Sequence, residues 1–429
     1  MNPSDTIIIG AGAAGLMAAY ELTKAGKKVI LVEARNRIGG RCYTFSGEGF
    51  TVPLELGAEF IHGDLPLTFK LLKEAGIQYE AVSGDNFEAK NGEIKASEFF
   101  MGHWDEFEKA LGEVQEDQPL ETFLKQNFHE EKFAGLRKSV IQFAAGYDTA
   151  DPKRVSLFSL RDEWLNNPIE EMQYRIPGGY VQLMDYLAGQ IKNSGGEIVL
   201  NTSVKQINWG AGSVEVITAD DASFTGKKLV LTVPLGILSL DPDQPGAIQF
   251  NPDLPQQRKA AAEMGFGAII KILMEFTEPF WEEKGLRNMQ FLFSEEKIPT
   301  WWTQRPQNNH VLTGWLGGNP QDEMQALSDG ELLQHAIHSL ANIFKADASF
   351  ITQKMVTAKV YNWTADPFTR GSYSYATVET NAARKILKMP VEQTIYFAGE
   401  ALFDGEQLGT VEAALVSGLE VAKEMIAGF

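Results

Sequence analysis

Two short apolar runs flank a helical pattern at the start of the chain. Residues 6–9 are apolar and end at Gly10, and residues 29–32 form a second apolar run that Glu33 closes. Between them, residues 13–25 carry apolar side chains at helical spacing. The pattern therefore predicts a compact strand–helix–strand unit.

The remaining pattern divides into helical and strand-rich stretches. Residues 80–195 are mostly helical in pattern, and the proline-rich residues 241–255 act as a connector. Periodicity further predicts helices over residues 331–344 and 411–426, and strands over residues 198–200, 204–207, 214–217, 229–233, 266–276 and 395–398. Helices interleaved with strands predict an α/β fold.

The same alternation predicts two interleaved domains. We expect one α/β domain to take residues 1–80, 195–240 and 385–429. We expect a second domain, a mixed sheet with helices, to take residues 81–194 and 241–384. A chain of 429 residues is long enough to build both cores.

Charge and cysteine content restrict the partners and the compartment. The net charge of −19 repels nucleic acid and anionic membranes and attracts cationic ligands, although solubility alone also explains it. Cys42 is the only cysteine, so we expect a reducing compartment. Neither a basic signal region nor a run of roughly 18 apolar residues is found. We therefore expect a soluble, cytoplasmic protein that binds neither nucleic acid nor membrane; the oligomeric state stays open.

A glycine-rich turn follows the first predicted strand. Gly10, Gly12 and Gly15 fit G-x-G-x-x-G, with Ala14 inside the motif, and the turn opens the first predicted helix. The three glycines permit a tight turn, close approach of a pyrophosphate, and close helix–strand packing, while the helix N-terminus faces the phosphates. Glu33 ends the second strand, where its carboxylate can bind a ribose diol and would repel a 2′-phosphate. This Rossmann-like unit predicts a dinucleotide site and disfavours NADP.

The residues after Glu33 separate FAD from NAD. Ala34 and Arg35 follow directly, and Gly40 and Arg41 come a few positions later. Glycine allows close backbone approach, and an arginine beside it can neutralise a pyrophosphate. Arg41 is the favoured phosphate ligand, whereas Arg35 could equally form a surface salt bridge. NAD dehydrogenases have no evident need for such an element, so it favours FAD.

The chain resembles the flavin-containing amine oxidases through several motifs in the family's order. Residues 10–41 are similar to the N-terminal signature, and residues 54–63 (LELGAEFIHG) to a flavin-facing segment of polyamine-type members. Residues 176–180 (IPGGY), 232–238 (TVPLGIL) and 396–418 are similar to further segments. The family includes monoamine, polyamine and L-amino-acid oxidases and flavin histone demethylases, and the resemblance lies nearer the polyamine oxidases.

The resemblance implies a two-domain flavoprotein, an activity and a cofactor site. The activity is hydride transfer from an amine carbon to N5 of FAD, with hydrolysis of the imine and reoxidation by O2 to H2O2. Val204 would contact the adenine, Glu400 the ribityl and phosphate region, and the backbone N–H of Val411 the flavin pyrimidine, where a helix N-terminus stabilises negative charge. The further cofactor contacts that it implies are Gly57, Ala58, Glu59, Gly399, Gly409 and Thr410.

The resemblance also implies an amine site. It places Lys271 near flavin N5 through a water, Trp363 beside the flavin ring, and Tyr373 as one wall of the amine pocket. By its own surroundings Lys271 is costly to bury unless paired, and could instead point to solvent from an edge strand. Ser372 stands where monoamine oxidases attach flavin through a cysteine, which implies noncovalent FAD. Thr410 replaces their second cage tyrosine, which implies a more open site.

Three histidines, one near Glu59 and two on a predicted helix, carry weaker signals. His62 and Glu59 lie on the implied substrate path and could hold a distal ammonium, although His62 could equally be an ordinary loop residue. His335 and His338 are three apart on a predicted helix, without the acidic or cysteine neighbours that would support a metal site. We therefore expect no metal, and the acidic balance favours a cationic amine or polyamine as substrate.

Other functions stay open beside this one. An L-amino-acid oxidase or tryptophan-type flavoenzyme would need an arginine for the substrate carboxylate, and the sequence identifies none. A flavin-dependent desaturase or isomerase would not consume oxygen, and a noncatalytic FAD-binding protein would hold flavin that no amine reduces. The motifs around Lys271, Trp363 and Tyr373 favour the amine oxidase. Histone demethylation is disfavoured, because no chromatin-binding module or coiled-coil insertion is seen.

Overall fold

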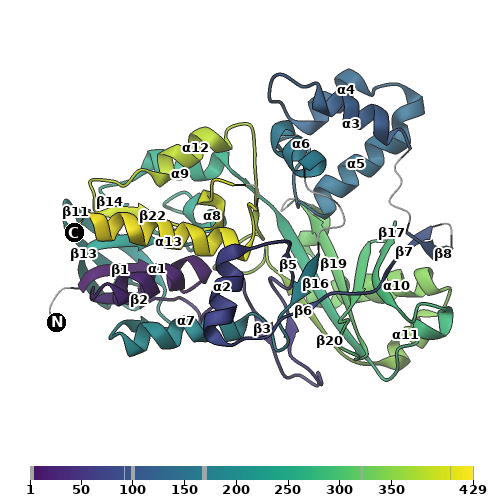
Figure 1. Cartoon of the computed structure of the whole chain (residues 1–429), viewed down its shortest axis with the longest axis horizontal. Coiled ribbons are helices and arrows are strands. Elements are labelled where there is room, and N and C mark those ends of the chain that lie inside the picture. The colour runs from purple at the N-terminus through teal and green to yellow at the C-terminus, as the bar shows by residue number, and fades with distance from the viewer. Residues whose placement is uncertain are drawn as a thin grey trace.

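The computed structural model describes residues 4–90, 92–97, 102–166, 172–319, 322–405 and 407–428. Residue 406, inside the C-terminal motif, lies outside this part of the chain. Figure 1 shows three regions: one that holds both chain ends, one built on a large twisted sheet, and a helical lobe above them.

The region with both chain ends contains an eight-stranded sheet. Its strands are β1 (Ser4–Ile9), β2 (Val29–Val32), β10 (Glu197–Val199), β11 (Val204–Gly210), β12 (Ser213–Thr218), β13 (Ser223–Leu231), β14 (Gln249–Asn251) and β22 (Ile395–Phe397). The order is β10-β2-β1-β13-β12-β11-β14, and β22 also pairs with β13. β1 is parallel to β2 and β13, whereas β12 is antiparallel to β11 and β13.

Helices cover both faces of this sheet. Ile8 of β1 joins the core of one face, while Ile7 and Ile9 join that of the other, because successive strand residues point to opposite sides. The first face is covered by α1 (Ala13–Lys24), α2 (Pro66–Ala75), α7 (Val181–Asn193) and α13 (Val411–Ala427). The other face carries α8 (Leu235–Leu238), α9 (Pro255–Glu263) and α12 (Thr380–Lys388).

The second region is a seven-stranded sheet in the order β20-β16-β19-β18-β17-β7-β8. Its strands are β7 (Asp85–Lys90), β8 (Glu93–Ala96), β16 (Ala268–Phe276), β17 (Met289–Ser294), β18 (Thr300–Thr303), β19 (Val311–Gly318) and β20 (Met355–Asn362). The helices α10 (Asp329–Phe344) and α11 (Ala348–Lys354) pack against it. Every residue of β16 is buried, because its side chains alternate between two covered faces: Ile270, Ile272 and Met274 join the core with α10 and α11, and Leu273 joins another cluster.

The helical lobe and three small sheets complete the described chain. The lobe holds α3 (Trp104–Gly112), α4 (Leu120–Asn127), α5 (Ala134–Gly146) and α6 (Leu157–Asn166), around a core that includes Phe107 and Phe123. The small sheets pair β3 (Thr44–Phe45) with β4 (Leu54–Glu55), β9 (Gln173–Arg175) with β5 (Ile61–His62) and β6 (Glu80–Ala81), and β15 (Gly265–Phe266) with β21 (Ser374–Tyr375).

Two sequence expectations need correction. The stretch 80–195, predicted as mostly helical, also contains β7 and β8; the polar, exposed β8 has no strand-like apolar pattern of its own and is held by pairing with β7. Residues 266–276 were expected to form one strand, but β15 ends before Gly267. A Cβ on this glycine would lie 1.9 Å from the hydroxyl of Thr149. The break between β15 and β16 therefore lies where Thr149 closely approaches Gly267.

The packing also bears on the division into domains. Residues 181–193 pack on the first sheet as α7, and residues 249–251 and 255–263 join it as β14 and α9. The division expected from sequence had placed these three segments with the second domain. Among the described helices, none is both long and apolar enough to cross a membrane.

Candidate active site

One large cavity gathers the candidate residues from both sheets. Its volume is about 1550 Å³, well above that of a pocket for one small ligand. It is lined by every candidate site residue except Gly15: Gly10, Gly12, Ala14, Glu33, Ala34, Arg35, Gly40, Arg41, Gly57, Ala58, Glu59, His62, Val204, Lys271, Trp363, Tyr373, Gly399, Glu400, Gly409, Thr410 and Val411. Residues that are far apart in sequence therefore share one space.

The glycine turn between β1 and α1 forms a cradle at one end of this cavity. Gly10 has a φ of +102°, which a residue with a side chain rarely adopts. A Cβ on Gly15 would lie 1.9 Å from the carbonyl oxygen of Gly10, so Gly15 serves the packing of the turn. A Cβ on Gly12 would meet nothing within 4 Å, so this glycine faces open space at the N-terminus of α1. The cradle therefore fits a pyrophosphate.

Glu33 and Arg35 shape the cavity next to the cradle. The buried Glu33 carboxylate accepts hydrogen bonds from the backbone N–H of Ala11 (2.7 Å) and of Arg35 (2.9 Å). The Arg35 guanidinium donates to Asp366 (2.5 Å) and Thr369 (2.8 Å). Arg35 thus forms a buried tie to the segment before Tyr373 rather than a surface salt bridge.

Arg41 connects two further motifs at the cavity wall. Its guanidinium donates to the backbone oxygen of Ser372 (2.6 Å) and to the Glu400 carboxylate (2.8 Å). Glu400 also accepts a hydrogen bond from the Ser374 hydroxyl. The N-terminal arginine, the C-terminal motif and the strand beside Tyr373 are therefore fixed to one another.

The N-terminus of α13 opens onto the same cavity. Gly409 has a φ of +82° and lies against Tyr373, with 3.2 Å between its ideal Cβ position and that ring. The Thr410 hydroxyl caps the helix by accepting from the backbone N–H of Ala413 (3.1 Å) and donates to the Gln407 carbonyl (2.7 Å). Val411 begins the helix and lines the cavity, so the helix N-terminus points a positive dipole end into it.

Lys271 is buried and paired, which excludes the alternative that it points to solvent. It lies in the interior strand β16 with 1% of its surface exposed. Its ammonium donates to the carboxylate of Glu59 at 2.5 Å and to the backbone oxygen of Gly57 at 3.2 Å. Glu59 also pairs with Arg175 at 2.8 Å. The carboxylate expected to hold cofactor or substrate therefore holds two side chains of the protein itself.

Three of the candidate residues contribute rings to the cavity wall. Trp363 is buried and donates its indole N–H to the Leu56 carbonyl (2.8 Å). The Tyr373 hydroxyl donates to the Tyr147 carbonyl, and burial, reinforced by the charge of Asp148, raises the pKa of Tyr373 well above its ordinary value. Burial lowers the pKa of His62 to about 4, so its ring is neutral at physiological pH.

Sequence reasoning missed an acidic pair in this cavity. Asp148 follows α5 and Glu163 lies on α6, and both line the cavity. Burial raises the pKa of both carboxyl groups, and for Asp148 the neighbouring Glu163 charge adds to this effect. Their stretch was predicted only as helical, and acidic residues on helices are usually solvated. Only the docking of the lobe over the cavity distinguishes these two.

Arg175 and Trp302 were missed as well. Both donate to Glu59, and the distance from the Trp302 indole nitrogen is 2.9 Å. Arg175 directly precedes the IPGGY motif, which is the one signal that could have pointed to it. Trp302 lies in β18 and has no comparable signal.

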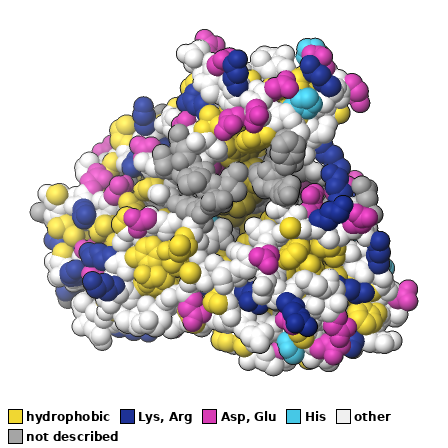
Figure 2. All heavy atoms as spheres, turned by 45° about the vertical axis from the view of Figure 1, so that its right-hand side comes forward, with side chains coloured by type: hydrophobic (Ala, Val, Ile, Leu, Met, Phe, Trp, Pro, Cys, Tyr) yellow, Lys and Arg dark blue, Asp and Glu magenta, His cyan; other side chains and the backbone are white. Residues whose placement is uncertain are grey.

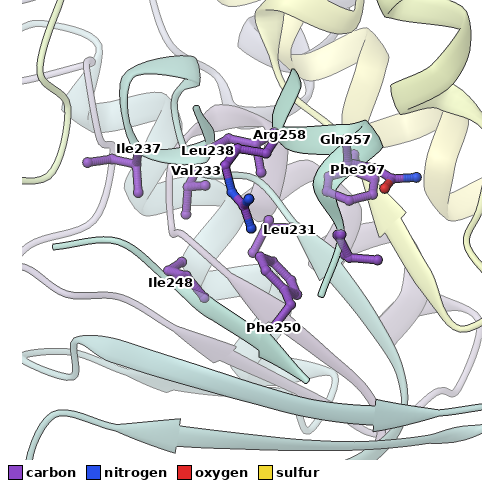
Figure 3. A pocket seen from close by; sticks show the side chains of 10 residues that line it. Leu231, Val233, Ile237, Leu238, Ile248, Phe250, Gln257, Arg258 and Phe397 are labelled. Atoms are coloured by element: carbon purple, nitrogen blue, oxygen red, sulfur yellow. The ribbon is translucent and has the colours of Figure 1, made fainter. Parts of the chain in front are cut away.

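A second pocket is small and apolar. Its volume of about 10 Å³ holds at most one water molecule. Leu231, Ile248, Phe250 and Phe397 line it, with the Arg258 side chain reaching across (Figure 3). We read it as a packing defect of the first sheet.

Figure 2 shows charges of both signs spread over the outer face, with acidic side chains along the lower edge of the helical lobe.

These features together define a flavin-dependent amine oxidoreductase. The family model for flavin containing amine oxidoreductases matches residues 13–426, so the chain belongs to this family. FAD is its cofactor, and the cradle, the buried Glu33 and the cavity volume fit that group.

Named relatives agree with this membership. Polyamine oxidase 4 of Oryza sativa subsp. japonica is 28% identical, with 99% of this chain and 88% of that protein covered. Lysine-specific histone demethylase 2 of Homo sapiens is 29% identical, with 98% and 53% covered. This chain therefore spans about half of that demethylase.

Solved structures show the same fold. Putrescine oxidase bound to putrescine superposes with a TM-score of 0.81 at 22% identity, with 99% of each chain covered. Cyclohexylamine oxidase from Brevibacterium oxydans IH-35A gives a TM-score of 0.78 at 21% identity, again over 99% of each chain.

Proposed function

We propose that this amine oxidase acts on a diamine or polyamine, with one nitrogen at the reacting carbon and a second, charged nitrogen at Asp148 and Glu163. The observation that carries the proposal is the acidic pair in the cavity wall beside Tyr373. Two carboxyl groups with raised pKa values are costly to keep charged without a counterion, so an ammonium group fits them well.

The arginines around the cavity favour an amine over an amino acid. An L-amino-acid oxidase needs a cation for the substrate carboxylate. Each arginine that lines the cavity in the described chain already has an acidic partner: Arg35 with Asp366 (2.5 Å), Arg41 with Glu400 (2.8 Å) and Arg384 with Asp404 (3.0 Å). None of these three arginines is free for a substrate carboxylate, which leaves Lys90 and Lys297 as the other cations of the outer cavity wall, so the amino-acid alternative is less well supported.

Different residues of the chain have different proposed roles in binding and reaction. Gly10, Gly12 and Glu33 would hold the dinucleotide, and Trp363 with Tyr373 would give the amine a dry, aromatic approach. Lys271 would present a fixed cationic donor to the reacting centre. Bound FAD supplies the two-electron chemistry that takes a hydride from the carbon next to nitrogen and returns the electrons to O2 as H2O2. Water then hydrolyses the imine product.

Several finer points belong to the same proposal. The FAD is held noncovalently, since Ser372 stands at the position of the attachment cysteine and the one cysteine, Cys42, is buried. One domain, built on the first sheet, holds the cofactor, and the other forms the amine side. The lone cysteine supports a reducing, cytoplasmic location.

Anaerobic mixing tests this function. The purified yellow protein is mixed with putrescine, spermidine, phenethylamine, tryptophan or leucine, and flavin bleaching is followed. We expect putrescine or spermidine to bleach the flavin fastest. Bleaching by tryptophan or leucine alone would instead establish the amino-acid alternative. If none bleaches it while dithionite does, amine oxidation of this kind is refuted.

A further inference from the structure

Glu59 lies at the centre of a buried cluster that joins four segments. Its carboxylate accepts from Lys271 of β16 (2.5 Å), from Arg175 of β9 (2.8 Å) and from the indole N–H of Trp302 of β18 (2.9 Å). All four side chains are buried. Glu59 itself comes from the segment between β4 and β5, next to Gly57, so the cluster ties the cofactor-side segment to the second sheet.

The cluster holds two cations and one anion. Burial by itself raises the pKa of Glu59, but the charges of Lys271 and Arg175 and two hydrogen bonds outweigh it and hold that pKa below its ordinary value. Burial lowers the pKa of Arg175, and Glu59 opposes this. Glu59 is therefore the anion that both cations share, and its two oxygens fix where the Lys271 ammonium and the Arg175 guanidinium lie.

We propose that Glu59 is a positioning residue of this enzyme, which fixes the ammonium of Lys271 at the cavity wall. Lysine has three N–H donors, and Glu59 and Gly57 accept two of them. The third is left for a molecule in the cavity, since no further acceptor for it is found in the described chain. The inference rests on the proposed role of Lys271 and adds the residue that orients its ammonium.

Other charged groups near the cluster must be separated from Lys271. Glu55 of β4 interacts electrostatically with Lys271 and Glu59, and His62 of β5 lines the same cavity as a neutral ring. Because the charge of Lys271 lowers the pKa of Glu55, removing Lys271 also changes the ionisation of Glu55. The comparison is therefore made in a Glu55→Gln background, where this side chain cannot titrate.

The test is a double-mutant cycle on the reduction potential of the bound flavin, which needs no amine. In this background the potential is measured with Lys271→Met, with Glu59→Gln, with both and with neither, at one pH. We expect Lys271→Met alone to shift the potential, because it removes a cation from the cavity wall. Beside Glu59→Gln the same substitution should have a smaller effect, because the ammonium is no longer fixed there.

Glu275→Gln is the matched control. Glu275 is a buried carboxylate on the same strand, bound to Thr51 (2.9 and 2.6 Å), and does not line the cavity. It should leave the effect of Lys271→Met on the potential undiminished. An undiminished effect beside Glu59→Gln as well would overturn the proposal. Should Glu59→Gln not fold, Glu59→Gln with Arg175→Met removes an anion and a cation together, and the same two outcomes decide.

The rate of flavin reduction by amine is the second readout. Glu59→Gln should slow this rate at least about tenfold, and adding Lys271→Met should change it further by less than about twofold. Full additivity of the two effects would contradict the role of Glu59 through Lys271. If no amine reduces the wild-type flavin, the proposed function fails, while the potentials still report on Glu59.

Discussion

Arg41 and Glu400 form an ion pair with 2.8 Å between guanidinium nitrogen and carboxylate oxygen, although 359 positions separate them. Arg41 comes from the N-terminal signature and Glu400 from the C-terminal motif, and both line the cavity. The pair therefore joins the N-terminal signature to the C-terminal motif at the cavity wall.

Removing one member of this pair should weaken cofactor binding. Glu400→Gln removes the carboxylate that holds the Arg41 guanidinium and the Ser374 hydroxyl at the cavity wall, so the proposed phosphate ligand is no longer fixed. We expect the dissociation constant of FAD to rise at least about tenfold, or about 1.4 kcal/mol, by fluorescence titration of the apoprotein. Glu420→Gln, which breaks the exposed pair with Lys388, is the control. Equal affinity of both variants and wild type would argue against a cofactor role for the pair.

Two glycine substitutions should separate cofactor binding from folding. An alanine Cβ at position 12 meets no protein atom within 4 Å, whereas one at position 57 would lie 1.7 Å from the Arg41 carbonyl oxygen. Gly12→Ala should leave the apoprotein Tm nearly unchanged yet weaken FAD binding at least about tenfold, because the methyl group fills the cradle. Gly57→Ala should lower the apoprotein Tm. Loss of apoprotein stability in Gly12→Ala would show that the cradle is structural.

The acidic pair should strengthen the binding of diamines and leave the binding of monoamines unaffected. Asp148→Asn should raise the KM for putrescine about tenfold or more, because it removes a hydrogen bond to a charged group. The KM for a monoamine of equal length should stay unchanged. Because burial raises the pKa of this carboxyl, it is protonated at low pH and binds a cation better as pH rises. The diamine KM should therefore fall with rising pH in wild type and lose this dependence in the variant. Equal changes for both amines would place the effect elsewhere.

Glu55 should make stability depend on pH. Burial raises the pKa of Glu55 to about 7 from its ordinary 4.5, although a hydrogen bond from the Tyr180 N–H acts to lower it. The folded state thus binds the proton more tightly, so stability falls as pH rises from about 4.5 through 7, by roughly 3 kcal/mol.

Glu55→Gln should remove this loss. The Tm of the variant relative to wild type should increase with pH over that window, measured on holoenzyme at saturating FAD. Glu197→Gln, at an exposed position of β10, should show no such trend. A pH-independent difference for Glu55→Gln would mean that this carboxyl is ionised in the fold.

The sequence alone determined the strand–turn–helix unit on which the proposed cofactor site rests. Periodicity and glycine spacing set the strand–turn–helix unit with Gly10, Gly12 and Glu33, because a tight turn and a helix N-terminus are local properties of a short segment. Motif resemblance gave the residues that line the cavity from both chain ends. It could not give their partners, and Lys271 read from its neighbours alone could as well have faced solvent.

Only the tertiary structure decided what those residues touch. Glu59, Arg175 and Lys271 come from separate elements and meet because two sheets and a short segment pack together. Asp148 and Glu163 become cavity residues because the helical lobe docks above them, although their own stretch carries no signal beyond helicity. Contacts between segments far apart in sequence depend on packing, and no local pattern encodes them.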